Sequence, residues 1–133
     1  MKYLLDTNIC IYLIKKKPFK VFEKFKNIEP GDIGVSSITV AELKYGVYKS
    51  QHLEKNKVAL TQFLIPLEIV SFDVNATVIY GQIRANLERE GMIIGAMDML
   101  IAAQAVALDL ILITNNIKEF TRVPNLKLEN WID

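Results

Sequence analysis

Two short, wholly apolar runs each end abruptly in a cluster of small polar side chains. Tyr3-Leu4-Leu5 is followed by Asp6-Thr7-Asn8, and Leu110-Ile111-Leu112-Ile113 is followed by Thr114-Asn115-Asn116. Uninterrupted apolar runs of this length are typical of strands buried on both faces, which occur in parallel sheets. Both polar clusters are therefore expected at the carboxyl edge of one sheet, where open α/β sheets bind their ligands.

Helical periodicity between these runs completes an alternating pattern of strands and helices. The further elements expected from it are strands at residues 33–35, 68–72 and 126–128 and helices near residues 9–13, 21–25, 38–48, 53–64, 75–90 and 95–108. Parallel strands need crossover connections, which usually contain a helix, so this order predicts an α/β fold with a mostly parallel sheet. The length of 133 residues suits a single domain, 1–133.

The composition limits the kinds of metal site and compartment. A single cysteine, Cys10, forms no internal disulfide, which favours a reducing compartment such as the cytoplasm. With one cysteine and one histidine, His52, a zinc site is excluded, so a bound metal is expected to be a hard ion with oxygen ligands. The net charge of +1 gives no overall attraction to nucleic acid. No apolar run reaches the roughly 18 residues of a membrane span, so no membrane partner is expected.

Three carboxylates, Asp6, Glu42 and Asp98, are placed against apolar sequence. Asp6 directly follows a buried strand, and Asp98 stands at the start of an almost wholly apolar helix. Glu42 lies one helical turn from Ile38 and Tyr45, in a stripe that we expect to face the interior. Asp6 and Asp98 also have a purely structural interpretation, as helix N-caps.

Convergence of these three side chains would require a cation. Two carboxylates about 4 Å apart repel by roughly 4 kcal/mol at an effective dielectric near 20, so a trio would cost about as much as a domain's whole stability. Protonation or a lysine partner are alternatives, but oxygen-only ligands on rigid elements suit Mg²⁺ or Mn²⁺. Such an ion lowers the pKa of a bound water and offsets charge on a phosphate, so the pattern predicts phosphodiester hydrolysis.

Four separated motifs then identify a family. They are Leu4-Leu5-Asp6-Thr7-Asn8, Val40-Ala41-Glu42-Leu43, Gly95-Ala96-Met97-Asp98-Met99-Leu100-Ile101-Ala102-Ala103, and Leu112-Ile113-Thr114-Asn115-Asn116 with Glu119-Phe120. In this order the chain closely resembles the PIN-domain ribonucleases, specifically the VapC-type toxins of bacterial toxin–antitoxin pairs. The resemblance covers nearly the whole chain, up to Leu128-Glu129-Asn130-Trp131.

The resemblance implies a three-layer α/β/α domain that cleaves RNA with Mg²⁺ or Mn²⁺. Asp6 and Asp98 would bind the metal directly, and Glu42 would bind it through water or help to activate the nucleophile. Supporting roles fall to the polar neighbours of these acids, namely Thr7 and Asn8 beside Asp6, and Thr114 and Asn115 at the second strand end. Many relatives have a fourth acid at that strand end. This chain has the neutral Asn116 there, with Glu119 one turn further on.

The resemblance also implies partners. It predicts a homodimer, a VapB-type antitoxin that occupies the catalytic groove with a C-terminal segment, and a structured RNA substrate such as initiator tRNA or ribosomal RNA. Cleavage of that RNA would inhibit translation. Lys15, Lys16 and Lys17 are candidates for binding RNA phosphates; the alternative is that they form an ordinary solvent-exposed helix end.

Two other functions are consistent with a small α/β domain of this kind. A phospho-accepting signalling module would also hold Mg²⁺ with aspartates at strand ends, but it needs paired acids after the first strand, where this chain has Asp6 and Asn8. A PIN-like binding protein without activity is the second alternative, and retention of all three acids argues against it. Tyr45 and Tyr48, at helical spacing, are expected in the core, with a protein interface as the alternative.

Overall fold

Five parallel strands form the central sheet of the computed structural model, which describes residues 1–132. The strands, in the spatial order β3-β2-β1-β4-β5, are β3 Glu68–Val70, β2 Ile33–Ser36, β1 Tyr3–Leu5, β4 Ile111–Ile113 and β5 Lys127–Glu129. Every neighbouring pair is parallel. The predicted parallel α/β sheet is therefore confirmed.

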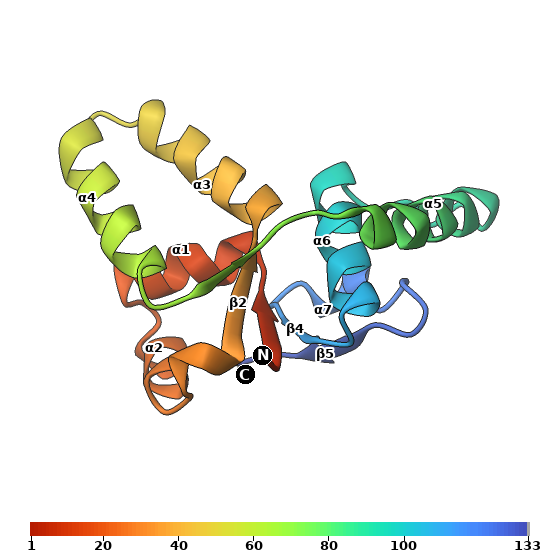
Figure 1. Cartoon of the computed structure of the whole chain (residues 1–133), viewed down its shortest axis with the longest axis horizontal. Coiled ribbons are helices and arrows are strands. Elements are labelled where there is room, and N and C mark those ends of the chain that lie inside the picture. Colours follow the sequence, from red (N-terminus) through yellow and green to blue (C-terminus); the bar gives the residue numbers. More distant parts are fainter. Residues whose placement is uncertain (133) are drawn as a thin grey trace.

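Helices cover the sheet on both faces and complete three layers. They are α1 Thr7–Lys15, α2 Phe19–Lys26, the 3-10 helix η1 Pro30–Asp32, α3 Ser37–Tyr48, α4 Leu53–Leu64, α5 Val74–Arg89, α6 Ala96–Ala107 and α7 Ile117–Phe120. Figure 1 shows α1 to α4 on the left of the sheet and α5 to α7 on the right. Within residues 1–132, no helix combines the length and the apolar character needed to cross a bilayer.

Alternate side chains of β1 belong to separate hydrophobic clusters on the two faces of the sheet. Leu4 packs with Leu87 of α5 and with much of α6 on one face, whereas Leu5 packs with Ile9 of α1 and Leu43 of α3 on the other. Successive strand residues point to opposite faces, so a strand that is apolar at both positions must be covered twice. The uninterrupted apolar runs in the sequence follow from this double coverage.

The register of β1 and β4 brings the two polar clusters together. Leu5 pairs with Ile113, so Asp6 and Thr114 follow at the same level of the sheet. The Asp6 backbone N–H continues the pairing and donates to the Ile113 carbonyl at 3.0 Å. The carboxyl edge of the sheet therefore gathers side chains that are more than a hundred residues apart in sequence.

The expected orientation of α3 was wrong. Tyr45 and Tyr48, predicted to face the core, are 66% and 63% exposed. The buried side chains are instead Thr39, Leu43 and Val47, which repeat every four residues and form the face toward α1 and α4. Tyr45 and Tyr48 point away from this face and lie in solvent.

The bounds of both edge strands also differ from the prediction. β3 ends at Val70 and not at residue 72, because Phe72 leaves the sheet and its backbone N–H donates to Ser37 Oγ at 3.3 Å. β5 lies one residue later than predicted, because its register pairs Leu112 with Leu128. Both strands are at the edges of the sheet, where pairing on one side alone leaves the ends least constrained.

One buried polar side chain, Gln104 of α6, ties the two helical layers together. Ser36 Oγ, which caps α3 by accepting from the Ile38 N–H, donates to Gln104 Oε1. Gln104 Nε2 in turn donates to the Val70 carbonyl at 3.2 Å. Gln104 is 1% exposed, so water does not reach it. Its side chain instead supplies hydrogen bonds to the Ser36 hydroxyl at the start of α3 and to the Val70 carbonyl at the end of β3.

Truncation of Gln104 should therefore destabilise the fold. Gln104→Ala leaves a cavity, removes the acceptor of the Ser36 hydroxyl hydrogen and removes a donor to the Val70 carbonyl, and each buried hydrogen-bonding group left unpaired costs about 1–3 kcal/mol. Urea unfolding should show a loss of at least about 2 kcal/mol in the free energy of unfolding. The matched control, Gln82→Ala on the exposed face of α5, should stay within about 0.5 kcal/mol. Equal effects of the two variants would contradict this role.

Candidate active site

Asp6 is the most buried acid at the carboxyl edge of the sheet, at 4% exposure. It is the N-cap of α1, as its structural interpretation anticipated, and its Oδ1 accepts from the Ile9 backbone N–H at 2.8 Å. Its second oxygen, Oδ2, accepts from the Thr114 hydroxyl at 2.5 Å. Thr114 Oγ1 also accepts from the Asn116 backbone N–H at 2.9 Å. Both oxygens of the Asp6 carboxylate are thus fixed in orientation.

The environment of Asp6 disfavours its negative charge. Burial raises the pKa of Asp6 from 3.8 to about 6, and the nearby Asp98 and Glu42 act in the same direction. The hydrogen bonds from Thr114 and Ile9 oppose this rise in the pKa because they stabilise the charged form. A buried carboxylate beside two others is an arrangement that a divalent cation would relieve.

Glu42 is fixed by a different threonine. Thr7 Oγ1, at the start of α1, donates to Glu42 Oε1 at 2.7 Å and lies 3.2 Å from Thr39 Oγ1. Thr7 had been expected to orient Asp6, but in the structure it orients Glu42. The bond connects α1 to α3 across 35 positions of sequence and holds the half-buried Glu42 at the same edge as Asp6.

Asp98 comes from the other helical layer. It lies in the first turn of α6, whose N-cap is Gly95, so Asp98 is not the N-cap of that helix. The Asp98 side chain is half-buried, and burial raises its pKa, with Glu42 and Glu119 adding to the effect. Asp98 therefore faces acids from α3 and α7 as well as Asp6.

The strand end after β4 supplies a further acid. Glu119 of α7 accepts from Asn116 Nδ2 at 3.2 Å and acts on Asp98 electrostatically. Asn116 thus holds the carboxylate of Glu119 on the side of Asp98. Asn115 points elsewhere, because it is exposed and its Nδ2 donates to the Tyr12 hydroxyl at 3.2 Å.

Asp6, Glu42, Asp98 and Glu119 together form what we call the carboxylate cluster. Asp6 interacts with Glu42 and Asp98, and Asp98 interacts with Glu42 and Glu119. Among residues 1–132, however, no three acidic, histidine or cysteine side chains are arranged as ligands around one point. Mg²⁺ keeps several waters and takes one or two carboxylates directly, so an oxygen-only cluster of this openness fits such an ion.

An apolar groove opens beside the cluster. It has a volume of about 280 Å³ and runs between α1, α3 and α4. Thr7 and Glu42 line it with Lys15 and a set of mainly apolar side chains, Ile11, Ile14, Leu43, Gly46, Val47, Asn56, Ala59 and Leu60. A groove of this kind accepts an apolar side chain or a helix better than it accepts phosphates.

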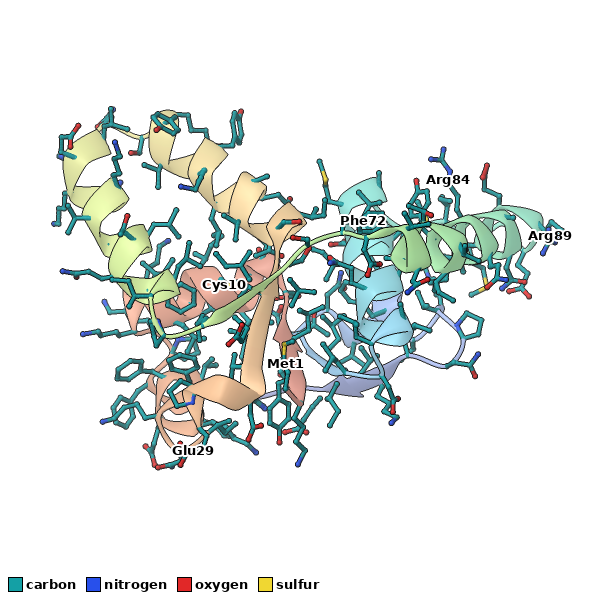
Figure 2. The ribbon with its side chains drawn as sticks, viewed as in Figure 1. Met1, Cys10, Glu29, Phe72, Arg84 and Arg89 are labelled. Atoms are coloured by element: carbon teal, nitrogen blue, oxygen red, sulfur yellow. The ribbon has the colours of Figure 1, made fainter. Side chains whose placement is uncertain are left out.

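Other predicted site residues lie outside the cluster. Asn8 is exposed, and no described side chain hydrogen-bonds to it. Lys15, Lys16 and Lys17 are exposed at the far end of α1. The two arginines of α5, Arg84 and Arg89, were not among the predicted site residues and also lie away from the strand ends (Figure 2), where Arg84 Nη1 donates to the Tyr80 hydroxyl at 2.8 Å.

The sequence reasoning missed Thr39. This side chain is fully buried beside Thr7 and supports the oxygen that holds Glu42. Thr39 lies three residues before Glu42, so both side chains are on one face of α3. This spacing is the sequence feature that could have predicted the role of Thr39. A threonine between apolar residues is ordinary in a helix, so this signal is weak.

Comparison with known proteins agrees with this geometry. The sequence model of the PIN-domain family matches residues 3–126. Ribonuclease VapC2 of Rickettsia felis is 49% identical, and the tRNA(fMet)-specific endonuclease VapC of Shigella flexneri is 44% identical, each over 98% of both chains. The crystal structure of DNA-bound VapBC from Salmonella typhimurium has a TM-score of 0.93 at 41% identity, covering 98% of both chains.

These matches confirm the resemblance seen in the motifs and exclude the phospho-accepting signalling module. The PIN-domain match covers β1 to β4 and the positions of all four acids of the carboxylate cluster, and the two named relatives align over 98% of the chain. Ribonucleases of this family depend on a metal ion, in agreement with the acidic character of the site. The chain therefore belongs to the PIN-domain family, as one of its VapC ribonucleases.

Proposed function

We propose that this protein is a toxin that hydrolyses phosphodiester bonds in structured RNA with Mg²⁺ or Mn²⁺ and thereby inhibits translation. The observation that supports this most is the convergence of the carboxylate cluster from α3, α6, α7 and the end of β1. Burial and mutual repulsion make such a cluster costly, and a divalent cation bound there would offset the cost.

The residues of the cluster take distinct roles in this proposal. Asp6 and Asp98 would hold the ion, and Thr114 keeps the Asp6 carboxylate in its orientation. When bound, the ion supplies a water of lowered pKa and offsets the negative charge that develops on the phosphate. Glu42, held by Thr7, orients the attacking water, and Glu119, held by Asn116, supplies the fourth acid of the site.

The substrate class follows from the relatives. The Shigella flexneri relative is named for cleavage of tRNA(fMet), and it is 44% identical to this chain over 98% of both. We propose initiator tRNA as the first RNA to test, with ribosomal RNA as the second. The protein would act within the cytoplasm, where both RNAs are found.

A VapB-type antitoxin is the proposed protein partner. Related toxins have been crystallised as VapBC complexes. In this chain the apolar groove between α1, α3 and α4 has Glu42 and Thr7 in its wall. A C-terminal antitoxin segment seated in the groove would cover Glu42 and so block the active site.

The exposed face of α3 is the proposed homodimer contact. Tyr45 and Tyr48 are 66% and 63% exposed, and exposed aromatic side chains in adjacent turns are typical of protein interfaces. These side chains are within two turns of Glu42, so a second copy on this face would narrow the approach to the active site.

Neutralising one acid of the cluster should abolish cleavage. Asp6→Asn and Asp98→Asn keep the side-chain shape but remove a metal ligand, and each should lower the cleavage rate of initiator tRNA by at least about a hundredfold. Thr114→Val should lower it by about 10- to 100-fold, because it frees the Asp6 carboxylate. The control is Asp109→Asn, an exposed acid that precedes β4 at the opposite edge of the sheet. Full activity of Asp6→Asn or Asp98→Asn would refute the assignment.

Metal binding should stabilise the fold and should do so through the same acids. At 100 times its Kd, an ion that binds only the folded state adds about 2.7 kcal/mol, so Mg²⁺ or Mn²⁺ should raise the melting temperature measured by circular dichroism. The increase should largely disappear in Asp98→Asn and persist in Asp109→Asn. An equal increase in both variants would show that the ion binds elsewhere.

Charge on the exposed face of α3 should break the homodimer. Tyr45→Glu combined with Tyr48→Glu places two buried negative charges per protomer in the proposed contact. Light scattering after size exclusion should give the monomer mass for this variant and the dimer mass for the natural protein. Ile65→Glu, at a site that is 75% exposed outside α3, is the control and should leave the mass unchanged. A monomeric natural protein would contradict the dimer.

A further inference from the structure

The positive charge of this chain is concentrated in one short segment. Residues 15–26 contain six of the 16 lysine and arginine residues and one of the 15 aspartate and glutamate residues. The rest of the chain is therefore net acidic, although the whole carries a net charge of only +1. The local field around α2 is opposite in sign to that of the carboxylate cluster.

All six lysines of this segment are exposed on or next to α2, and we call this region the basic α2 face. It consists of Phe19 and the exposed lysines Lys15, Lys16, Lys17, Lys20, Lys24 and Lys26. Val21 of α2 is fully buried and anchors the helix on the domain, so the opposite side of α2 must face solvent. Among the described residues, Lys24 is the one lysine of this face with a carboxylate within 4.0 Å, at 3.7 Å from Glu129. The other lysines are available to an external anion.

An aromatic ring lies at the centre of this charge. Phe19 is 67% exposed, and it borders a hollow of about 310 Å³ with Lys20, Glu23, Lys24 and Asn27. Most of the Phe19 ring therefore contributes nothing to the hydrophobic core. Its flat face is open to a planar ligand, and its neighbours are positively charged.

A second ring fixes two of the ammonium groups. Lys16 Nζ lies 5.5 Å and Lys26 Nζ 5.6 Å from the centre of the Phe22 ring. Cation–π contacts of this kind hold lysine side chains against the surface and reduce the entropy lost when an anion binds. The two ends of the basic α2 face are thus partly preorganised.

The position of α2 separates this face from the carboxylate cluster. Asp6 caps the first turn of α1, and Lys16 caps its last turn. A helix of nine residues spans about 13 Å, so the basic α2 face begins about one helix length from Asp6. Figure 1 shows α2 beyond the end of α1 that is remote from the strand ends. An RNA bound at both places must extend well past the nucleotides at the scissile bond.

We propose that the basic α2 face is a second RNA-binding site, which anchors a part of the substrate remote from the cleaved bond. The lysines contact phosphates, and the ring of Phe19 stacks on an unpaired base. This proposal rests on the proposed ribonuclease function and adds to it a requirement for long, folded RNA. It explains how a nearly neutral protein with an acidic active site retains a polyanion.

RNA fits this face better than an acidic protein segment does. Lysines attract both RNA and an acidic polypeptide. An exposed aromatic ring between lysines favours single-stranded RNA, because the ring can stack on a base while the lysines contact the neighbouring phosphates. Lysine contacts are independent of sequence, so this face would contribute affinity while the choice of bond stays with the active site. An acidic polypeptide as the true ligand is one outcome of the test below.

Binding of a fluorescently labelled initiator tRNA transcript tests the proposal. All proteins carry Asp98→Asn so that the RNA stays intact. Neutralising α2 with Lys20→Gln, Lys24→Gln and Lys26→Gln should raise the Kd about tenfold at moderate salt. It should also reduce the slope of log K against log salt by about 2, since each lost phosphate contact removes about 0.7–0.9. Phe19→Ala should raise the Kd about fivefold and leave the slope unchanged.

The matched control neutralises three lysines elsewhere. Lys55→Gln and Lys57→Gln are on exposed positions of α4, and Lys127→Gln is on an exposed position of β5; together they change the net charge equally. If the control weakens tRNA binding as much as the α2 variant, the effect is one of net charge and the proposal fails. It also fails if polyglutamate displaces the tRNA as effectively as polyuridylate at equal charge, because the face would then select any acidic chain.

Cleavage kinetics with Asp98 restored distinguish this proposal from the ribonuclease function. The α2 variant should cleave initiator tRNA with a KM raised about tenfold and an unchanged kcat, because no side chain of the carboxylate cluster is altered. An unchanged KM would overturn the second binding site while leaving the ribonuclease function intact. Failure of the natural protein to cleave any RNA, with binding still lost in the α2 variant, would count against the ribonuclease function alone.

Discussion

Repulsion between carboxylates at the carboxyl edge of the sheet is the constraint on which the site depends. The parallel pairing of β1 with β4 forces Asp6 and Thr114 together, while the second turn of α3 and the first turn of α6 bring Glu42 and Asp98 to the same edge. The pKa of Asp6, raised to about 6, reflects the cost of a charge held at 4% exposure. The two hydrophobic clusters on either side of the sheet stabilise the fold and offset the free-energy cost of this buried charge.

Asp6, Glu42 and Glu119 accept hydrogen bonds from neutral donors, and within residues 1–132 no acid of the carboxylate cluster has a lysine or arginine nitrogen within 4.0 Å. Asp6 receives the Thr114 hydroxyl and the Ile9 N–H, and Glu42 receives the Thr7 hydroxyl. A cationic partner would neutralise the cluster permanently and leave no need for a metal. Hydroxyl and amide donors fix the orientation of the carboxylates while leaving their charge available, which is the property that a metal site requires.

The sequence marks the candidate acids more clearly than the side chains that support them, for a physical reason. Asp6 and Asp98 stand out because a charged side chain interrupts or precedes apolar sequence, and this is visible along the chain. The Thr114 bond to Asp6 spans 108 positions, and the Gln104 bond to Ser36 spans 68, so neither partner can be paired from local pattern. The interior face of α3 was misassigned because the tyrosines are apolar enough for a core. Periodicity does not show which face of a helix the neighbours cover.

Helix α1 separates the carboxylate cluster from the basic α2 face. Its N-terminus, the positive end of the helix dipole, meets the Asp6 carboxylate, and its C-terminus, the negative end, carries Lys15 and Lys16. One short helix therefore carries opposite charges at its two ends, each stabilised by the dipole. An acidic site by itself would repel the phosphates on either side of the scissile bond. A basic surface one helix length away can hold the RNA without neutralising the acids, since exposed charges more than about 10 Å apart are largely screened at moderate salt.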